Sequence, residues 1–333
     1  MSTPAAPAVV TALAPAREQS AMPVPLPPPS SRSPSESGAA KSTTWVAVKR
    51  HRHFYYFIAP FFVLFGIFGL YPLAFSLYLS FVKWDGLMPM RWVGLGNFHV
   101  MLEDEILAAS LWNTLVIGLL YVPPMLTLAF LLAVALNASW LRARAVRRAS
   151  IFLPCVTPMV VIAIVFGLLL SAERGLLNYA LSIVGIAPID WLNDARWSKV
   201  SVALLVMWRW TGYNMVLMLA GLQGISGDYY EAAAVDGATR WRQLCHVTLP
   251  LMRPTFMFCL MLSLIGTVYM FDEPFVLTKG GPGTSSMNFG LYLFNVSFGE
   301  FRFGYASCIA YTVSLGVLVV SLAFNRLRRG GHA

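Results

Sequence analysis

Six long apolar stretches constrain the fold of this chain more than any other feature of its sequence. They cover residues 54–81, 111–136, 151–170, 200–220, 254–277 and 304–324. A helix needs about 20 mostly apolar residues to cross a bilayer, and backbone groups in lipid must be hydrogen-bonded within the segment. Only 12% of the residues are charged, whereas soluble domains carry about 25%. The sequence therefore predicts an all-α polytopic membrane protein with six transmembrane helices.

Prolines lie inside the first three stretches, among them Pro60, Pro72, Pro123, Pro124 and Pro158. Proline lacks a backbone N–H group, and its ring clashes with the preceding helical turn. We therefore expect kinks or helix boundaries at these positions.

Residues 1–44 differ from the rest of the chain because they are rich in proline, alanine and serine. They lack the basic start and the clean apolar run of a cleaved signal peptide. This composition predicts a disordered tail, either a plain linker or a segment with a helper role. Residues 45–333 then form the transmembrane domain.

The positions of the basic residues predict the orientation of the chain. If the N-terminus is cytoplasmic, the inner segments carry 16 of the 24 lysines and arginines and the outer loops carry 7. Cytoplasmic loops of membrane proteins are enriched in these residues, so both termini are expected in the cytoplasm. The basic clusters flank helix ends, which indicates contact with membrane lipid and no nucleic-acid binding.

Motifs for catalysis or for cofactor binding are absent from the sequence. Neither a GxxxxGK[ST] phosphate loop nor an HExxH motif nor a nucleophile elbow occurs, so we expect no enzyme activity, no cofactor and no bound ATP. Four cysteines show neither CxxC nor zinc spacing and are interpreted as free thiols rather than metal ligands: Cys155, Cys245, Cys259 and Cys308.

The polar segment 221–253, between the fourth and fifth stretches, is too long for a simple inner loop. Ser226 or Asp228 is expected to cap a short helix, and Gly237 to end it. A second short helix is expected over about 241–247, ended by Pro250 before the next span. Two interpretations stay open at this point: a helix hairpin resting on lipid headgroups, or a knob that docks a cytoplasmic partner.

This segment resembles the EAA loop of binding-protein-dependent ABC importer permeases. The shared pattern is E-A-A, three residues, G, nine residues and I-x-L-P, and the chain departs from it only in Val247. The resemblance implies a type I importer (MetI-like) permease fold, with the loop held in a cleft of a separate ATPase subunit that binds the ATP. By the same resemblance, the coupling residues are Glu231, Ala232, Ala233, Asp236, Gly237, Leu249 and Pro250.

Four further motifs resemble the carbohydrate branch of this family, specifically the larger permease of the maltose type. They are VGLGNF at 93–98, WNT at 112–114, WTGYNM at 210–215 and TKGGP at 278–282. The maltose protein has extra N-terminal spans, so the chain is nearer to lactose- and glycerophosphate-type relatives. The resemblance implies a bacterial inner-membrane importer of a sugar or oligosaccharide that works by alternating access. Its expected partners are a second permease in a heterodimer, two ATPase subunits and an extracytoplasmic sugar-binding protein.

Polar residues inside the fourth and fifth stretches mark the expected substrate path, because buried polar groups in a membrane usually face a cavity or a partner. Two other interpretations stay open: Arg209 snorkels to the outer interface, and Asp272 and Glu273 are simply solvated. By this argument Arg209 is an expected substrate contact, and the resemblance implies further sugar contacts from Trp210, Gly212, Asn214, Ser263, Thr267, Met270 and Asp272. Thr267 and Met270 replace asparagines of the family, so the identity of the sugar stays open.

Other functions remain alternatives. A permease for an amino acid or peptide is compatible with the EAA loop but is disfavoured by the motif at 278–282. A membrane enzyme that works alone should show a catalytic cluster. A secondary transporter should show inverted repeats and broken helices, and neither is evident from the sequence.

Overall fold

The computed structural model describes residues 52–138 and 143–330, so the expected tail at 1–44 lies outside the described residues. The chain divides into two units, Met1–Leu64 and Phe65–Ala333. The described part of the first unit belongs to helix α2 (Arg52–Phe65), where the rings of Phe61 and Phe62 meet edge to face.

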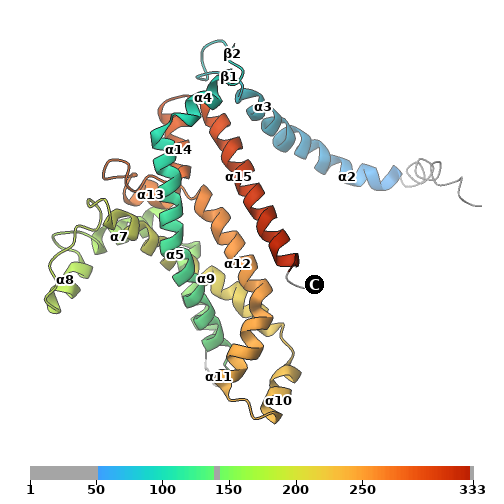
Figure 1. The fold of residues 1–333 in the computed structure, drawn as a ribbon, viewed down its shortest axis with the longest axis vertical. Helices are drawn as coiled ribbons and strands as arrows, with labels where there is room; N and C mark the ends of the chain where they lie inside the picture. The colour runs from blue at the N-terminus through green and yellow to red at the C-terminus, as the bar shows by residue number, and fades with distance from the viewer. Residues whose placement is uncertain (1–51, 139–142, 331–333) are drawn as a thin grey trace, which may run out of the picture. The chain divides into compact units, whose positions relative to one another are not determined.

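The second unit is built almost entirely from helices (Figure 1). They are α3 (Tyr71–Leu79), α4 (Gly96–Leu102), α5 (Glu105–Asn137), α6 (Arg144–Val156), α7 (Met159–Leu169), α8 (Leu176–Ile183), α9 (Trp197–Gln223), α10 (Gly227–Val235), α11 (Arg240–Gln243), α12 (Leu249–Tyr269), α13 (Asp272–Leu277), α14 (Phe289–Phe294) and α15 (Phe303–Gly330). Three π-helical turns occur at Gly66–Leu70, Leu244–Thr248 and Asn295–Gly299. A single short antiparallel pair, β1 (Val82–Lys83) with β2 (Arg91–Trp92), is the only sheet within the described ranges. The all-α prediction is confirmed.

Five described helical runs are long and apolar enough to cross a membrane: Tyr56–Leu79, Glu105–Asn137, Trp197–Gln223, Arg240–Val268 and Phe303–Ala323. The expected third span is not a straight helix, because α6 and α7 meet at an angle of 94°. Thr157 and Pro158 are extended at this bend, as expected where proline disfavours a helical residue before it. Counted as one span, the bent pair makes the sixth crossing.

The five prolines named above differ in their effect on the helices. Pro158 marks the bend, and Pro72 lies in the first turn of α3 after a π-helical turn. Pro60 lies inside α2, and both Pro123 and Pro124 lie inside the continuous α5. A proline therefore coincides with a helix boundary at two of the five positions.

Two boundaries of the expected fifth span are wrong. The sequence predicts that Pro250 ends a short helix before the fifth span begins. Instead, α11, a π-helical turn and α12 form one continuous helical run. The wider i→i+5 turn directly before Pro250 lets the ring enter the helix. At the other end, α12 stops at Tyr269, where Met270 and Phe271 leave the helical conformation before α13.

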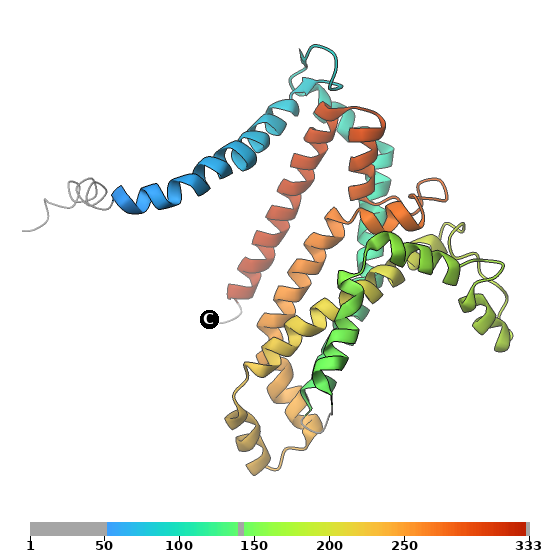
Figure 2. The same cartoon turned by 180° about the vertical axis from the view of Figure 1, so that it is seen from behind.

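Three helices, α5, α9 and α12, pack against one another and form the main core, in which methionines and alanines such as Met125, Ala129 and Met218 are buried (Figures 1 and 2). Close approach depends on glycine. A Cβ on Gly118 would lie 2.9 Å from Thr267 Cγ2, so α5 and α12 cross tightly there. Small residues at such crossings are the usual means of packing helices in a membrane.

Side chains from two sequence motifs fasten the loops at the end that carries β1 and β2. Asn97 donates to the carbonyls of Ser80 and Val82 at 2.9 and 3.1 Å. Asn113 donates to the carbonyls of Thr284 and Met287 at 2.8 and 2.9 Å. Irregular backbone needs such partners when it is buried. The motifs at 93–98 and 112–114 therefore have a structural role.

Asp104 joins three elements at the same end. Its carboxylate caps α5 by accepting from Leu107 N at 2.9 Å, and it accepts from the hydroxyls of Tyr292 and Tyr305. Partial burial raises the pKa of Asp104, but these hydrogen bonds lower it by more, so its pKa lies below the ordinary value. The carboxylate is therefore charged in its site and holds α5, α14 and α15 together.

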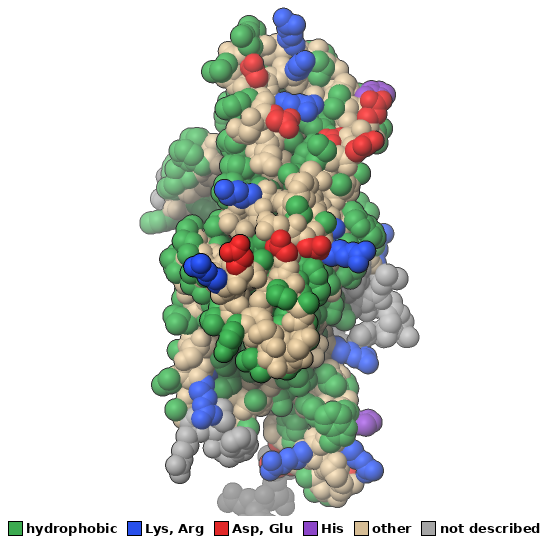
Figure 3. Space-filling view, turned by 90° about the vertical axis from the view of Figure 1, so that its left-hand side faces the viewer, with side chains coloured by type: hydrophobic (Ala, Val, Ile, Leu, Met, Phe, Trp, Pro, Cys, Tyr) green, Lys and Arg blue, Asp and Glu red, His purple; other side chains and the backbone are tan. Residues whose placement is uncertain are grey.

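Figure 3 shows many hydrophobic side chains along the sides of one face of the molecule. Acidic side chains gather in the upper half of this view, towards β1 and β2, and basic side chains are the main charges in the lower half. This distribution agrees with the charge bias on which the expected orientation rests.

Candidate functional site

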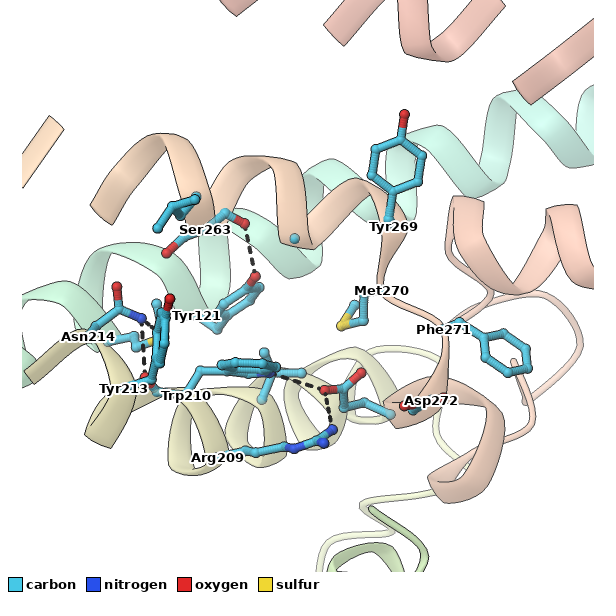
Figure 4. Close-up of a pocket in the computed structure, with 15 residues that line it drawn as sticks. Tyr121, Arg209, Trp210, Tyr213, Asn214, Ser263, Tyr269, Met270, Phe271 and Asp272 are labelled. Atoms are coloured by element: carbon cyan, nitrogen blue, oxygen red, sulfur yellow. Dashed lines mark hydrogen bonds and ion pairs between the residues drawn. The ribbon is translucent and has the colours of Figure 1, made fainter. Parts of the chain in front are cut away.

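A cavity of about 450 Å³ lies where α5, α9 and α12 meet the break between α12 and α13. Its size falls in the range of about 300–1,000 Å³ typical of small-molecule sites. Figure 4 shows Arg209 and Trp210 extending from α9 towards the start of α13, where Asp272 lies. The lining residues are Tyr121, Met125, Val206, Arg209, Trp210, Tyr213, Asn214, Leu262, Ser263, Gly266, Tyr269, Met270, Phe271, Asp272 and Glu273.

An ion pair forms one wall of this cavity. Arg209 Nη1 lies 3.1 Å from Glu273 Oε1, and the two side chains are only 14% and 6% exposed. Trp210 Nε1 donates to the same oxygen at 3.3 Å. Arg209 lies near the middle of the 27-residue α9 and donates to Glu273, which favours a role in the cavity wall over snorkelling. Glu273 is buried and is not simply solvated, whereas Asp272 is exposed.

Two buried polar atoms of lining residues have no hydrogen-bond partner: Arg209 Nε and Asn214 Oδ1. The amide nitrogen of Asn214 is already used, since it donates to the carbonyl of Trp210 at 3.1 Å. A buried donor or acceptor without a partner is costly and is rare in native proteins. Both atoms are buried within the α9 side of the cavity, whose lining also includes the rings of Trp210 and Tyr213.

The structure brings together six of the eight residues expected to contact substrate: Arg209, Trp210, Asn214, Ser263, Met270 and Asp272 all line the cavity. Their contact with a substrate stays a prediction. Thr267 is buried behind the wall, where its hydroxyl lies 2.6 Å from that of Tyr121. Gly212 faces α6 instead, because a Cβ there would lie against the Ile151 carbonyl group.

Other lining residues were not identified as substrate contacts from the sequence. Tyr121 belongs to α5, which carries no charged group near that position, so no local pattern indicates it. Glu273 was noticed only as a polar residue near the outer end of a span. Its proximity to Arg209 joins positions 64 apart in the sequence, and that proximity depends on the break after Tyr269.

The helix hairpin that contains the EAA pattern lies at the opposite end from β1 and β2 (Figures 1 and 2). Ser226 caps α10 by accepting from Asp228 N, and Gly237 ends the turn with a φ of +75°. This left-handed conformation favours glycine. Tyr230 and Thr248 join the two arms of the hairpin through their hydroxyls at 3.1 Å. The expected Ser226 cap and Gly237 break are confirmed.

Apolar side chains project from this polar hairpin. Val235 is 88% exposed and Trp241 is 72% exposed, although both belong to the end of the molecule that is rich in charged residues. Of the seven expected coupling residues, Ala233 is half-buried and the others are exposed: Glu231, Ala232, Asp236, Gly237, Leu249 and Pro250. Exposed apolar side chains rimmed by polar residues are typical of a protein-binding surface.

A polytopic helical protein with a polar cavity part-way along its helices and an exposed hairpin at one end has the architecture of a membrane transport subunit. Residues 125–330 match the family model described as "Binding-protein-dependent transport system inner membrane component". The chain belongs to this family. The resemblance drawn from the EAA pattern is therefore confirmed.

Curated relatives agree over most of the chain. The lactose transport system permease protein of Rhizobium radiobacter is 38% identical over 270 residues, which cover 80% of this chain and 90% of the relative. The arabinooligosaccharides transport system permease protein of Bacillus subtilis is 32% identical over 295 residues, which cover 87% of this chain and 93% of the relative.

Solved structures support the same fold. The crystal structure of a bacterial ABC transporter involved in the import of the acidic polysaccharide alginate contains a similar chain, with a TM-score of 0.74 and 24% identity. The match covers 86% of this chain and 98% of that one. The type I importer fold expected from the sequence is confirmed.

Proposed function

We propose that this chain is the sugar-conducting permease subunit of a binding-protein-dependent ABC importer. It carries a sugar or oligosaccharide across the bacterial inner membrane by alternating access, driven by a separate ATPase. Family membership supports the transport role, and relatives named for lactose and arabinooligosaccharides support the substrate class.

The observation that carries the proposal is a cavity of sugar size whose lining combines aromatic rings with polar side chains. A sugar presents hydroxyl groups, each both donor and acceptor, and apolar ring faces. Hydroxyls can pair with polar side chains of the lining such as those of Tyr213 and Ser263. Trp210 and Tyr213 supply flat apolar surfaces for the sugar ring.

A free amino acid or peptide fits this cavity less well. Its terminal ammonium and carboxylate groups each call for an opposite charge that is free to pair. Among the lining residues the one cation, Arg209, is already paired with Glu273. The cavity therefore favours an uncharged polar solute over this alternative class.

The hairpin is the proposed coupling surface. Its exposed Val235 and Trp241, together with Glu231 beside them, offer an apolar and acidic surface to the cleft of an ATPase subunit. The sequence has no phosphate loop of its own, so two partner ATPase subunits bind ATP, and this chain is a carrier of solute rather than an enzyme. It binds no metal or other cofactor in this proposal.

The remaining partners follow from exposed apolar surface and from charge. Large apolar side chains after Phe65 are exposed, such as Phe68 (76%) and Tyr71 (66%), and would contact lipid or a second permease subunit. An extracytoplasmic sugar-binding protein would deliver the substrate to the end that carries β1 and β2. The excess of basic residues supports a cytoplasmic location for the hairpin and both termini.

Uptake by the reconstituted transporter tests this function. The complete complex is placed in liposomes with ATP inside and the sugar-binding protein outside, and labelled disaccharides are screened for uptake. Wild type is expected to accumulate a sugar only with ATP. Gly237→Val should abolish uptake while the complex still inserts, because a β-branched residue is strained at a φ of +75°.

Gly227→Val provides the matched control, since Gly227 lies in the same hairpin, has no positive φ and leaves open space around an added Cβ. This control should retain most of the uptake. ATP-dependent uptake of amino acids instead of sugars, or full uptake by Gly237→Val, would contradict the proposal.

A further inference from the structure

The cavity wall has an excess of negative charge, and this inference rests on the proposed sugar-carrying function. Its three charged lining residues are Arg209, Asp272 and Glu273. Arg209 is neutralised by Glu273 at 3.1 Å. Asp272 is exposed and has no ion pair among residues 52–138 and 143–330. One carboxylate is therefore left over, and no cation in this wall is free to meet an anionic solute.

The buried ion pair between Arg209 and Glu273 is not required for the stability of the fold. Removing two charges from water is expensive, and replacing a buried pair by apolar residues of similar size is often neutral or stabilising. Uncharged side chains of similar size would therefore be sufficient to pack α9 against α13. A charged pair in the wall of a cavity indicates a role towards what enters the cavity.

The position of the two carboxylates makes that role specific. Asp272 and Glu273 are consecutive residues in the first turn of α13, directly after the break at Met270 and Phe271. Both residues line the cavity, Asp272 as an exposed side chain and Glu273 as a buried one.

We propose that Asp272 and Glu273 are specificity-determining residues that make this cavity select neutral saccharides over saccharides with a carboxylate, such as uronates. A solute carboxylate at about 7 Å from the unpaired carboxylate, in a medium of effective dielectric constant about 20, is repelled enough to weaken binding by roughly tenfold or more. A neutral sugar meets no such repulsion. Hydroxyls can also accept from Arg209 without competing for Glu273.

Saturation-transfer NMR on the purified full complex, without the sugar-binding protein, measures this preference directly. The two probes are methyl β-glucoside and methyl β-glucuronide, which differ only in the C6 carboxylate. Wild type is expected to bind the glucoside at least about tenfold more tightly. Asp272→Asn leaves the Arg209–Glu273 pair intact and should reduce this ratio several-fold, and Glu273→Gln should reduce it further.

Glu300→Gln is the control, because Glu300 is a half-exposed carboxylate that does not line this cavity, and its ratio should match wild type. A wild-type ratio near one, or an unchanged ratio in Asp272→Asn, would overturn the inference and leave the sugar cavity in place. Asp272→Asn decides the question even where Glu273→Gln fails to fold. Binding of neither probe by wild type would instead count against the proposed function itself, and against this inference with it.

Discussion

The ion pair between Arg209 and Glu273 yields a prediction whose size follows from the structure. At 3.1 Å and an effective dielectric constant of about 20, the attraction between the two charges is about 5 kcal/mol. Removing both charges from water costs a comparable amount. The pair as a whole should therefore contribute little to stability, while either charge alone in this site should be strongly destabilising.

Three variants separate these effects: Arg209→Met, Glu273→Met and the double substitution. Each single variant leaves an uncompensated buried charge and should lose roughly 3–5 kcal/mol, which corresponds to a fall of about 10 °C in the melting midpoint. The double variant should melt close to wild type or above it. The loss in the Arg209 variant is increased because Glu273 keeps only its hydrogen bond from Trp210 Nε1.

The assay is thermal unfolding of the purified complex in detergent, followed by the loss of the monodisperse peak in size-exclusion chromatography. Arg302→Met is the matched control, because its pair with Glu300 is 3.3 Å long but 45% and 51% exposed. Exposed pairs contribute about 0–1 kcal/mol, so this variant should melt near wild type. Single variants of the buried pair that melt with wild type, or a double variant as unstable as the two losses added, would refute the reasoning.

Three further predictions concern packing, coupling and pH. Gly212→Ala should lower the melting midpoint by several degrees, since its Cβ would meet Ile151 and overpacking costs about 1–3 kcal/mol. Gly316→Ala is the control and should leave the midpoint unchanged, because an added Cβ there meets open space. An equal effect of both variants would contradict the packing role. Gly237→Ala should lose about 1 kcal/mol of stability at its positive φ and slow uptake, and unchanged uptake would contradict the coupling role. Asp104 has a lowered pKa, so its stabilisation is present above its ordinary value of 3.8 and is lost as the pH falls below that value. Melting curves from pH 6 to pH 3 should show this loss in wild type and not in Asp104→Asn, and identical pH profiles would contradict it.

Local patterns in the sequence were enough for most of the helices. The expected stretch at 200–220 appears as Trp197–Gln223, and that at 304–324 lies within Phe303–Gly330. Pro158 indicates that the helix is interrupted between α6 and α7, but no residue pattern indicates the angle of the bend. Hydropathy reports which residues prefer lipid, and it carries no information on direction.

The break after α12 depends on distant residues and was therefore missed. Neither glycine nor proline occurs at Met270 and Phe271. Instead Asn288 donates to the Met270 carbonyl, and Gly290 lets the α14 backbone approach that same carbonyl. A helix interrupted by contacts from a later loop leaves no periodic signal of its own.

The same reason limits what could be predicted of the site. The residues on α9 and α12 were found because polar groups inside apolar spans stand out. Tyr121 on α5 does not stand out, because tyrosine is common in such helices. Gly212 was assigned to the substrate because of its neighbours in the motif, but the structure places it against α6.

The most direct measurement of the central claim is a structure of the intact transporter, trapped with its sugar while the solute is in transit. The account predicts density for the sugar between α9 and α12, with hydroxyls within hydrogen-bond distance of polar lining side chains such as Tyr213 and Ser263. It also predicts the hairpin around Gly237 inside the ATPase cleft. Density for the sugar elsewhere, with this cavity empty or filled by side chains, would contradict the account.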